Sequence, residues 1–528
     1  DTTGGMGEEV TALATAWQQR FPGAETTLSN TYKLITFRDQ ANLVGATGSS
    51  AQMGNWLAAL ETAGDGTCPD NALGALAGAA RLAPRSPFSN SGALLLSDSA
   101  PYGSRPQLAR IVNILAERDL AVHPVFTGWC PGVPLAPRAM DQLAFGTGGR
   151  LPIFLTDTFG AGIDLALAEM ATPDLLGLYG GGGNAFADSY DIDVDSSIET
   201  LVLAATDEED PCAHPWAPLT CVRRLDPERQ VTVATALQLQ VRDPEGNLLT
   251  ADTPGVNFSE VSGLNMEINF STYPGPTVGT FQVEISGVNA GYLLRVSARS
   301  GASLNLLSPH TLPAGRTVPV VASLLLPAGQ RHPAAPQPTE ELFGAYNFLT
   351  RQTLPLELKD DGLSGDGVAG DGIYGGTWQL QPGLWQLVAW GQLEDGSAFR
   401  RAETAPIRVV RFDLSAPDQK RVMPGDNVNL AFTLQNDSPA PQQFELLVDS
   451  NQNWAVTGTV PASVTLAAGE MRKIQVPLAI PAEATIGTVE ETRLIALAPG
   501  DDPLDSQMAT AYAVAVDERL LYLPLLQQ

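Results

Sequence analysis

The sequence opens with Asp1-Thr2-Thr3-Gly4-Gly5-Met6-Gly7, directly before a segment with a helical pattern. A second stretch, Leu94-Leu95-Leu96-Ser97-Asp98, reads as a buried apolar strand that ends on a carboxylate. In an open parallel sheet, ligands bind at the carboxyl ends of the strands. We therefore expect Asp1 and Asp98 to lie at one edge of such a sheet.

Helix and strand patterns alternate around these two stretches over the first 170 residues. One predicted helix, at 107–118, carries apolar residues at helical spacing. Strands that alternate with helices of about a dozen residues are typical of βαβ units and a parallel sheet. The predicted helices are 7–21, 72–82, 107–118, 140–145 and 159–170, and the predicted strands are 32–37, 93–96, 120–126 and 151–155.

A run of four glycines at 180–183 ends this pattern and predicts a flexible joint. Beyond it, apolar residues follow the period of two that a half-buried strand requires, and no helix of useful length is predicted. The expected fold is multidomain: a doubly wound, Rossmann-like α/β domain followed by three all-β sandwiches. The predicted domains are 1–185, 186–312, 313–410 and 411–517, with a tail at 518–528.

Composition limits the classes of partner. The 528 residues include 30 Lys and Arg against 58 Asp and Glu, which gives a net charge of −28. A field this negative argues against nucleic acid and anionic membranes and favours cations and basic surfaces. No apolar run reaches the roughly 18 residues that a membrane span requires, so none is predicted.

The four cysteines are Cys68, Cys130, Cys212 and Cys221, and none forms a C-x-x-C pair. Cys212 and Cys221 bracket a Pro-rich loop, so a disulfide across that loop is the simple interpretation. Two disulfides would imply an oxidising compartment. The alternative is four buried thiols in a cytosolic protein.

Five stretches in this order resemble the von Willebrand factor A domain, most closely the hemicentin type, over about residues 1–171. The resemblance implies a metal-ion-dependent adhesion site. It also implies a disulfide between Cys68 and Cys130, because the hemicentin-like pattern places a cysteine in each of two neighbouring loops. The stretches are Asp1-Thr2-Thr3-Gly4, Asp65-Gly66-Thr67-Cys68-Pro69-Asp70, Leu96-Ser97-Asp98, Thr127-Gly128-Trp129-Cys130 and Thr147-Gly148-Gly149.

The metal motif of that family is D-x-S-x-S, followed later by a Thr and an Asp. Gly5 departs from it because glycine has no hydroxyl. The implied cofactor is a divalent cation, Mg²⁺ or Ca²⁺, bound by hard oxygen ligands. The alternative is an empty site in which the carboxylates cap helices and turns. The implied ligands are Asp1, Thr3, Asp98 and, at the family's threonine position, Asp70 or alternatively Thr67.

In that family, the residue matching Asp1 follows the central first strand of the sheet, so that strand is expected before residue 1. Two interpretations are open: the protein continues upstream, or a neighbouring chain donates the strand. A missing central strand would leave backbone groups unpaired inside the sheet, which is costly.

The β-domains carry weaker resemblances. Asp193-Val194-Asp195-Ser196-Ser197 is one of the signals by which residues 190–311 resemble the β-domain that follows hemicentin-like A domains. Met423-Pro424-Gly425-Asp426 is one of those by which residues 411–516 resemble immunoglobulin-like spacers of bacterial surface proteins. The ending Tyr522-Leu523-Pro524-Leu525 resembles short tails of some secreted bacterial proteins.

An acidic loop between 360 and 371 is a second candidate cation site. Four carboxylates this close repel one another unless they are solvated or neutralised. The loop lacks EF-hand spacing, but it resembles the Asp/Gly-rich loop of secreted chloride-channel-regulator-like proteins, which implies calcium. The alternative is a pair of Asp-Gly turns. The candidate ligands are Asp360, Asp361, Asp366 and Asp371.

No hydrolase or nucleotide-binding motif is present, and we expect no enzyme activity in this chain. We expect an extracellular protein, secreted or on the cell surface, that binds an extracellular protein or surface ligand. A carboxylate of the partner would complete the cation's coordination on the A-like domain, which is carried on β-sandwich spacers. The alternative is a structural subunit that self-associates into a surface layer or filament. The weakest reading is the accessory part of a secreted hydrolase.

Overall fold

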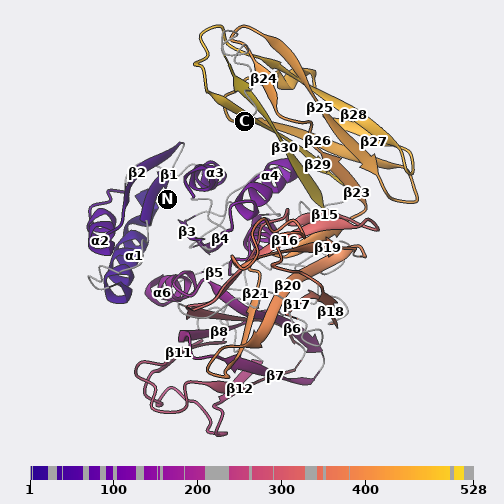
Figure 1. Ribbon diagram of the computed structural model, residues 1–528. Helices are drawn as coiled ribbons and strands as arrows, with labels where there is room; N and C mark the ends of the chain where they lie inside the picture. Colours follow the sequence, from indigo (N-terminus) through magenta and orange to yellow (C-terminus); the bar gives the residue numbers. More distant parts are fainter. Residues whose placement is uncertain are drawn as a thin grey trace, which may run out of the picture.

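The computed structural model (Figure 1) contains an α/β region, a central β region and a C-terminal β-sandwich. Strands outnumber helices by far among the described residues. None of the described helices is long and apolar enough to cross a membrane. The structure describes residues 2, 4–21, 32–37, 40–62, 71–83, 91–98, 104–126, 136–150, 153–154, 159–183, 185–208, 237–260, 264–288, 290–327, 342–348, 352–379, 381–499 and 505–516.

The α/β region is built on a parallel sheet in the order β3-β4-β5. Every residue of β4 is buried, as expected for a parallel strand with both faces covered. The predicted alternation of helices and strands is present here. The elements are η1 (Gly4–Met6), α1 (Gly7–Arg20), β1 (Tyr32–Phe37), β2 (Ala41–Thr47), α2 (Ser50–Ala58), α3 (Ala72–Leu82), β3 (Ser91–Ser97), α4 (Arg105–Ala116), β4 (Leu120–Phe126), α5 (Ala136–Gly146), β5 (Ile153–Phe154) and α6 (Phe159–Met170).

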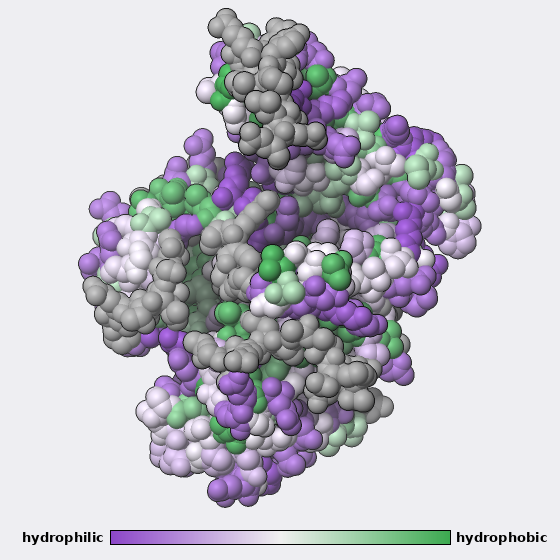
Figure 2. All heavy atoms as spheres, viewed as in Figure 1, coloured by the Kyte–Doolittle hydropathy of each residue, from purple (hydrophilic) through white to green (hydrophobic). Residues whose placement is uncertain are grey.

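The antiparallel hairpin β1-β2 stands apart from that sheet. An apolar cavity of about 250 Å³ lies between the hairpin and the sheet, lined by residues of both β1 and β3. In the part of the chain that the structure describes, β1 pairs only with β2, and β3 only with β4. Leu43 and Val44 of β2 are about half exposed, and Figure 2 shows apolar residues gathered over this hairpin.

One eleven-stranded sheet runs through the central β region. Its two halves are joined at β6 and β21 through a single residue pair, Leu175 with Ala402. The sheet therefore continues between the strands predicted for the second and third domains. Its strands are β6 (Asp174–Gly183), β8 (Ile198–Glu208), β10 (Val256–Ser259), β11 (Leu264–Asn269), β13 (Ala290–Ser300), β15 (Thr311–Pro313), β17 (Phe343–Asn347), β18 (Gln352–Leu356), β20 (Gly383–Gln392), β21 (Ala398–Ala402) and β22 (Ile407–Val410).

The glycine run that predicted a flexible joint lies inside β6, so that prediction is wrong. Its residues pair with β13, Gly181 opposite Tyr292. A Cβ added to Gly181 would lie 2.3 Å from the Asp188 carboxylate and 2.6 Å from the Tyr292 hydroxyl. The glycine is needed for close packing, which the sequence pattern does not distinguish from flexibility. This pairing places residues 174–183, which lie before the predicted boundary at 185, in the sheet of the central region.

Two three-stranded sheets pack on the central sheet, and each pair shares an apolar core. One sheet has the order β7-β12-β9 and the other β14-β16-β19. Both sandwich-like halves agree with the predicted β-rich fold. The strands are β7 (Phe186–Val194), β9 (Leu237–Arg242), β12 (Gly279–Gly287), β14 (Ser303–Leu306), β16 (Val318–Leu325) and β19 (Ile373–Trp378).

The C-terminal region is a sandwich of a three-stranded and a five-stranded sheet around one core. Trp454 lies in that core, 5% exposed. The predicted tail at 518–528 lies outside the described residues. The elements are β23 (Phe412–Ser415), β24 (Lys420–Val422), β25 (Asn427–Asn436), β26 (Gln442–Ser450), η2 (Thr457–Thr459), β27 (Ser463–Leu466), β28 (Met471–Ala479), β29 (Val489–Leu497) and β30 (Ser506–Ala515).

The C-terminal sandwich folds back onto α4 of the α/β region (Figure 1). Arg110 pairs with Asp449 at 3.1 Å, and the Asn113 side chain donates to Ser506 Oγ at 2.8 Å. The C-terminal region therefore packs directly against the α/β region. The apolar part of the contact is formed by Ala109, Leu447, Ile495, Leu497 and Met508.

Buried charges join the α/β region to the central sheet. Glu169 of α6 is fully buried and pairs with Arg150 at 2.6 Å. Arg295 of β13 approaches the same carboxylate at 3.5 Å and donates to the Gly148 carbonyl at 2.7 Å. Because isolated buried charges are costly, this arrangement constrains how the two regions fit together.

Candidate functional site

The predicted cation site lies where β1 and β3 end. Asp98 directly follows β3, and η1 leads into α1. The Thr2 backbone N–H donates to the carbonyl of Phe37, the last residue of β1, at 3.2 Å. A Cβ added to Gly5 would lie 2.9 Å from Asp98 Oδ2. The segment before α1 therefore packs directly against the Asp98 carboxylate.

Gly5 limits what this edge can bind. Without a hydroxyl, it offers no side-chain ligand at the third position of the motif. A serine in its place would bring a side chain into contact with the Asp98 carboxylate. The position at which this sequence departs from the family's metal motif is thus one where the backbone comes close to the Asp98 carboxylate.

The remaining predicted ligands and all the cysteines lie outside the described residues. The cation and disulfide assignments at these positions stay predictions. The residues are Asp1, Thr3, Asp70 with its alternative Thr67, and Cys68, Cys130, Cys212 and Cys221.

In the acidic loop between β18 and β19, carboxylates accept hydrogen bonds from backbone N–H groups of the same loop. Asp360 is fully buried and accepts from the N–H groups of Gly370 and Gly372 at 2.5 and 2.9 Å. Asp366 is 4% exposed and accepts from the Gly362 N–H at 2.7 Å. Two of the four carboxylates are therefore bound by the backbone of the loop.

The other two carboxylates each accept from the N–H two residues further on, which is an Asx turn. The bond from the Leu363 N–H to Asp361 is 2.9 Å long, and it is the main reason that the pKa of Asp361 is lowered. The corresponding bond from Ile373 to Asp371 is 3.0 Å long. This geometry is that of the Asp-Gly turns weighed as the alternative, and calcium binding here stays a prediction.

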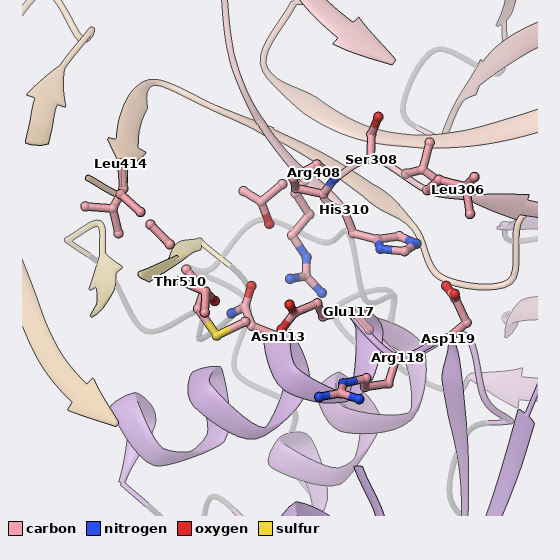
Figure 3. A pocket seen from close by; sticks show the side chains of 17 residues that line it. Asn113, Glu117, Arg118, Asp119, Leu306, Ser308, His310, Arg408, Leu414 and Thr510 are labelled. Atoms are coloured by element: carbon pink, nitrogen blue, oxygen red, sulfur yellow. The ribbon is translucent and has the colours of Figure 1, made fainter. Parts of the chain in front are cut away.

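Three titratable side chains that sequence reasoning did not single out meet where the regions join. Asp119 lies in the turn between α4 and β4, His310 between β14 and β15, and Glu403 just after β21. One possible ligand atom of each lies within 4.8 Å of the other two. Figure 3 shows the His310 ring and the Asp119 carboxylate turned toward each other. We call these three residues the junction cluster.

The backbone fixes each member of the junction cluster. Glu403 is fully buried and accepts from the N–H groups of Thr404, at 2.9 Å, and Leu306. Asp119 has a φ of 47°, which is uncommon for a residue other than glycine. The His310 carbonyl accepts from the Arg408 N–H at 2.7 Å.

The junction cluster has unusual electrostatics. Burial and the Glu403 carboxylate raise the pKa of Asp119 to about 7, against an opposite effect of His310. Burial alone would lower the pKa of His310, but Glu403 and Asp119 outweigh it and raise the pKa above its ordinary value. Two carboxylates share this small volume, so the site favours a positive charge.

Beside the junction cluster lies a cavity of about 620 Å³ (Figure 3). Asp119 and His310 line its wall, together with residues of α4, β22, β23 and β30. The cavity thus reaches all three regions. No local motif marks these residues, since they come from three distant parts of the chain, and only the fold brings them together.

Comparison with known proteins supports one region. Residues 411–513 match the family model of the VWA7 Ig-like domain. The C-terminal region is therefore an Ig-like β-sandwich, as the sequence predicted. No curated protein matches the chain.

Similar solved structures include bacterial α2-macroglobulins. Escherichia coli α2-macroglobulin activated by porcine elastase is 12% identical over 62% of this chain and 31% of that chain, with a TM-score of 0.19. The Salmonella protein reacted with methylamine is 12% identical over 65% and 23%, with a TM-score of 0.20. A PapD-like domain of human CEP192 is 10% identical over 20% and 87%, with a TM-score of 0.15. TM-scores this low carry no argument about the present chain.

Proposed function

We propose that this chain is an extracellular binding protein, secreted or on the cell surface, whose α/β region is a von Willebrand factor A-like domain. In this proposal a divalent cation, bound at the carboxyl ends of the strands, holds the partner. The observation that carries it is the packing of the segment around Gly5 against Asp98 at the end of β3. It is the juxtaposition that a cation site formed by Asp1, Thr3 and Asp98 requires.

Two further features support the A-like assignment. The apolar cavity between β1 and β3 lies where the sheet of von Willebrand factor A domains has its central first strand. The C-terminal region matches the Ig-like domain of a family named for VWA7, and that name links an Ig-like domain of this kind to von Willebrand factor A proteins.

The proposed mechanism is completion of a coordination shell. Mg²⁺ and Ca²⁺ prefer oxygen ligands, and Mg²⁺ in particular retains several exchangeable waters. With Gly5 contributing no hydroxyl, more positions on the ion are left for waters and for a carboxylate of the partner. The partner is then an extracellular protein or surface ligand with an exposed acidic side chain.

Calorimetric titration of the chelator-treated chain with Mg²⁺ and with Ca²⁺ tests this proposal. We expect Asp98→Ala to remove one binding event that the matched variant Asp371→Asn, in the acidic loop, retains. Identical titrations of Asp98→Ala and the unchanged protein would refute the cation site.

A second candidate, a self-assembling structural subunit, is favoured by one observation. The facing edges of β1 and β3 have no strand between them among the described residues, and the cavity there is apolar. A strand from another chain would pair with both edges. Light scattering in Ca²⁺ and Mg²⁺ and again in EDTA should then give a mass of many chains, and a single-chain mass in both buffers would rule this candidate out.

A further inference from the structure

The junction cluster has the composition of a transition-metal site. It offers one imidazole nitrogen and two carboxylate oxygens, all near enough to share one ion. Imidazole suits zinc better than calcium or magnesium, which take oxygen ligands. Three protein ligands with a fourth position left for water is a common zinc arrangement.

The distance between His310 and Glu403 fits a shared ion better than a direct hydrogen bond. His310 Nε2 lies 3.6 Å from Glu403 Oε1, which is beyond an ordinary hydrogen bond. Two ligand atoms that are each about 2.1 Å from a tetrahedral zinc lie roughly 3.4 Å apart. The observed separation is therefore close to the distance between two ligand atoms of one zinc ion.

Unsatisfied polar atoms point into the same place. The His310 side chain is 8% exposed, and its Nε2 has no hydrogen-bond partner. Asp119 Oδ1 is likewise buried without one. Buried polar atoms are usually satisfied, so this nitrogen and this oxygen, next to a buried carboxylate, are open to a ligand.

We propose that Asp119, His310 and Glu403 bind one zinc ion, with a water from the neighbouring cavity as the fourth ligand. This zinc site is separate from the cation site at Asp98. Its ligands come from the α/β region and from two segments of the central β region. Zinc binding would therefore lock these regions together.

Zinc titration of the chelator-treated full chain, competed against a chromophoric chelator, tests the site. We expect His310→Gln and Asp119→Asn each to weaken binding of one zinc at least about tenfold, since loss of even an outer-shell partner costs that much. Glu117→Gln is the matched control, because Glu117 lies in the same turn and lines the same cavity but is not in the cluster. Equal affinities in all four proteins would overturn the proposal.

X-ray absorption at the zinc edge needs no variant and covers the case in which a substitution prevents folding. We expect nitrogen and oxygen ligands at about 2.0–2.2 Å. Sulfur ligands at about 2.3 Å would place the ion on cysteines and overturn the site. Asp98→Ala should retain this zinc, and its loss in that variant would contradict the separation of the two sites.

Discussion

Arg401 is a large side chain that is fully buried. It pairs with Asp195, also fully buried, at 2.8 Å and donates to the Ala302 carbonyl at 2.9 Å. Removing one member of a buried pair leaves the other charge uncompensated, which costs about 3–5 kcal/mol. We expect Arg401→Met to lower the free energy of unfolding by that amount in urea denaturation.

Two controls accompany this prediction. The exposed pair of Arg299 with Glu199, 49% and 68% exposed, should contribute only about 0–1 kcal/mol, so Arg299→Ala should be nearly neutral. Adding Asp195→Asn to Arg401→Met should restore most of the loss, because neither charge of this pair then remains buried. A double variant as unstable as the single one would show that the packing of Arg401 matters more than its charge.

His123 makes stability depend on pH. Burial, followed by the charges of Arg295 and Arg150, lowers its pKa to about 3. The unfolded chain takes up this proton near pH 6.5, so the stability that a neutral His123 provides is present above pH 6.5 and is lost as the pH falls toward 3. From pH 6.5 to 5 the loss is about 2 kcal/mol.

The check is to measure unfolding of His123→Gln and the unchanged protein from pH 7.5 to 5. The stability difference between them should shift by about 2 kcal/mol in favour of the variant as the pH falls. If the stability of the two proteins changed with pH in the same way, the lowered pKa of His123 would be contradicted.

At the scale of an element, the acidic loop between β18 and β19 depends on Asp360. Replacing the carboxylate by an amide weakens its hydrogen bonds from the Gly370 and Gly372 N–H groups, each worth about 1.5–3 kcal/mol when the acceptor is charged. We expect Asp360→Asn to lower the free energy of unfolding by about that amount and the exposed Asp371→Asn to leave it nearly unchanged. Repeating the melts in Ca²⁺ and EDTA tests the calcium prediction, which identical midpoints would contradict.

Local patterns predicted individual elements well where periodicity was strong. The predicted spans 32–37, 72–82, 120–126 and 159–170 coincide with β1, α3, β4 and α6. These segments carry an apolar face or run in the sequence, which a pattern reports directly. The segment that contains β2 and α2 gave no prediction, since β2 is largely exposed and carries little apolar alternation.

What the sequence could not predict depends on contacts between distant segments. From the sequence, Gly181 indicates flexibility. In the structure, the side chains of Tyr292 and Asp188 fill the space that a Cβ at this position would need. Asp119, His310 and Glu403 share no motif, so only the packing of the regions reveals them. At the first candidate site, Gly5 lies close to the Asp98 carboxylate, as the resemblance implied. The other predicted ligands of that site all lie outside the described residues.

At the scale of the whole molecule, docking of the C-terminal sandwich on α4 makes the chain more compact than a row of spacers. We expect small-angle scattering to give a radius of gyration nearer to about 24 Å, the value for one compact chain of this length, than to that of four extended domains. Arg105→Glu combined with Arg110→Glu should increase it, because these residues face Glu445 and Asp449. Lys473→Glu, on the other sheet of the sandwich, is the control, and an equal increase there would contradict the docking.

The single residue pair between β6 and β21 has a mechanical consequence. On either side of Leu175 and Ala402 the large sheet is held by long antiparallel ladders, whereas this seam has one backbone pair and the buried Arg401 beside it. A pulling force applied across the sheet would concentrate at the seam and part it before the ladders shear. Under tension the central region would thus open as two intact halves, and the chain would lengthen in a step while both sandwich cores stayed folded.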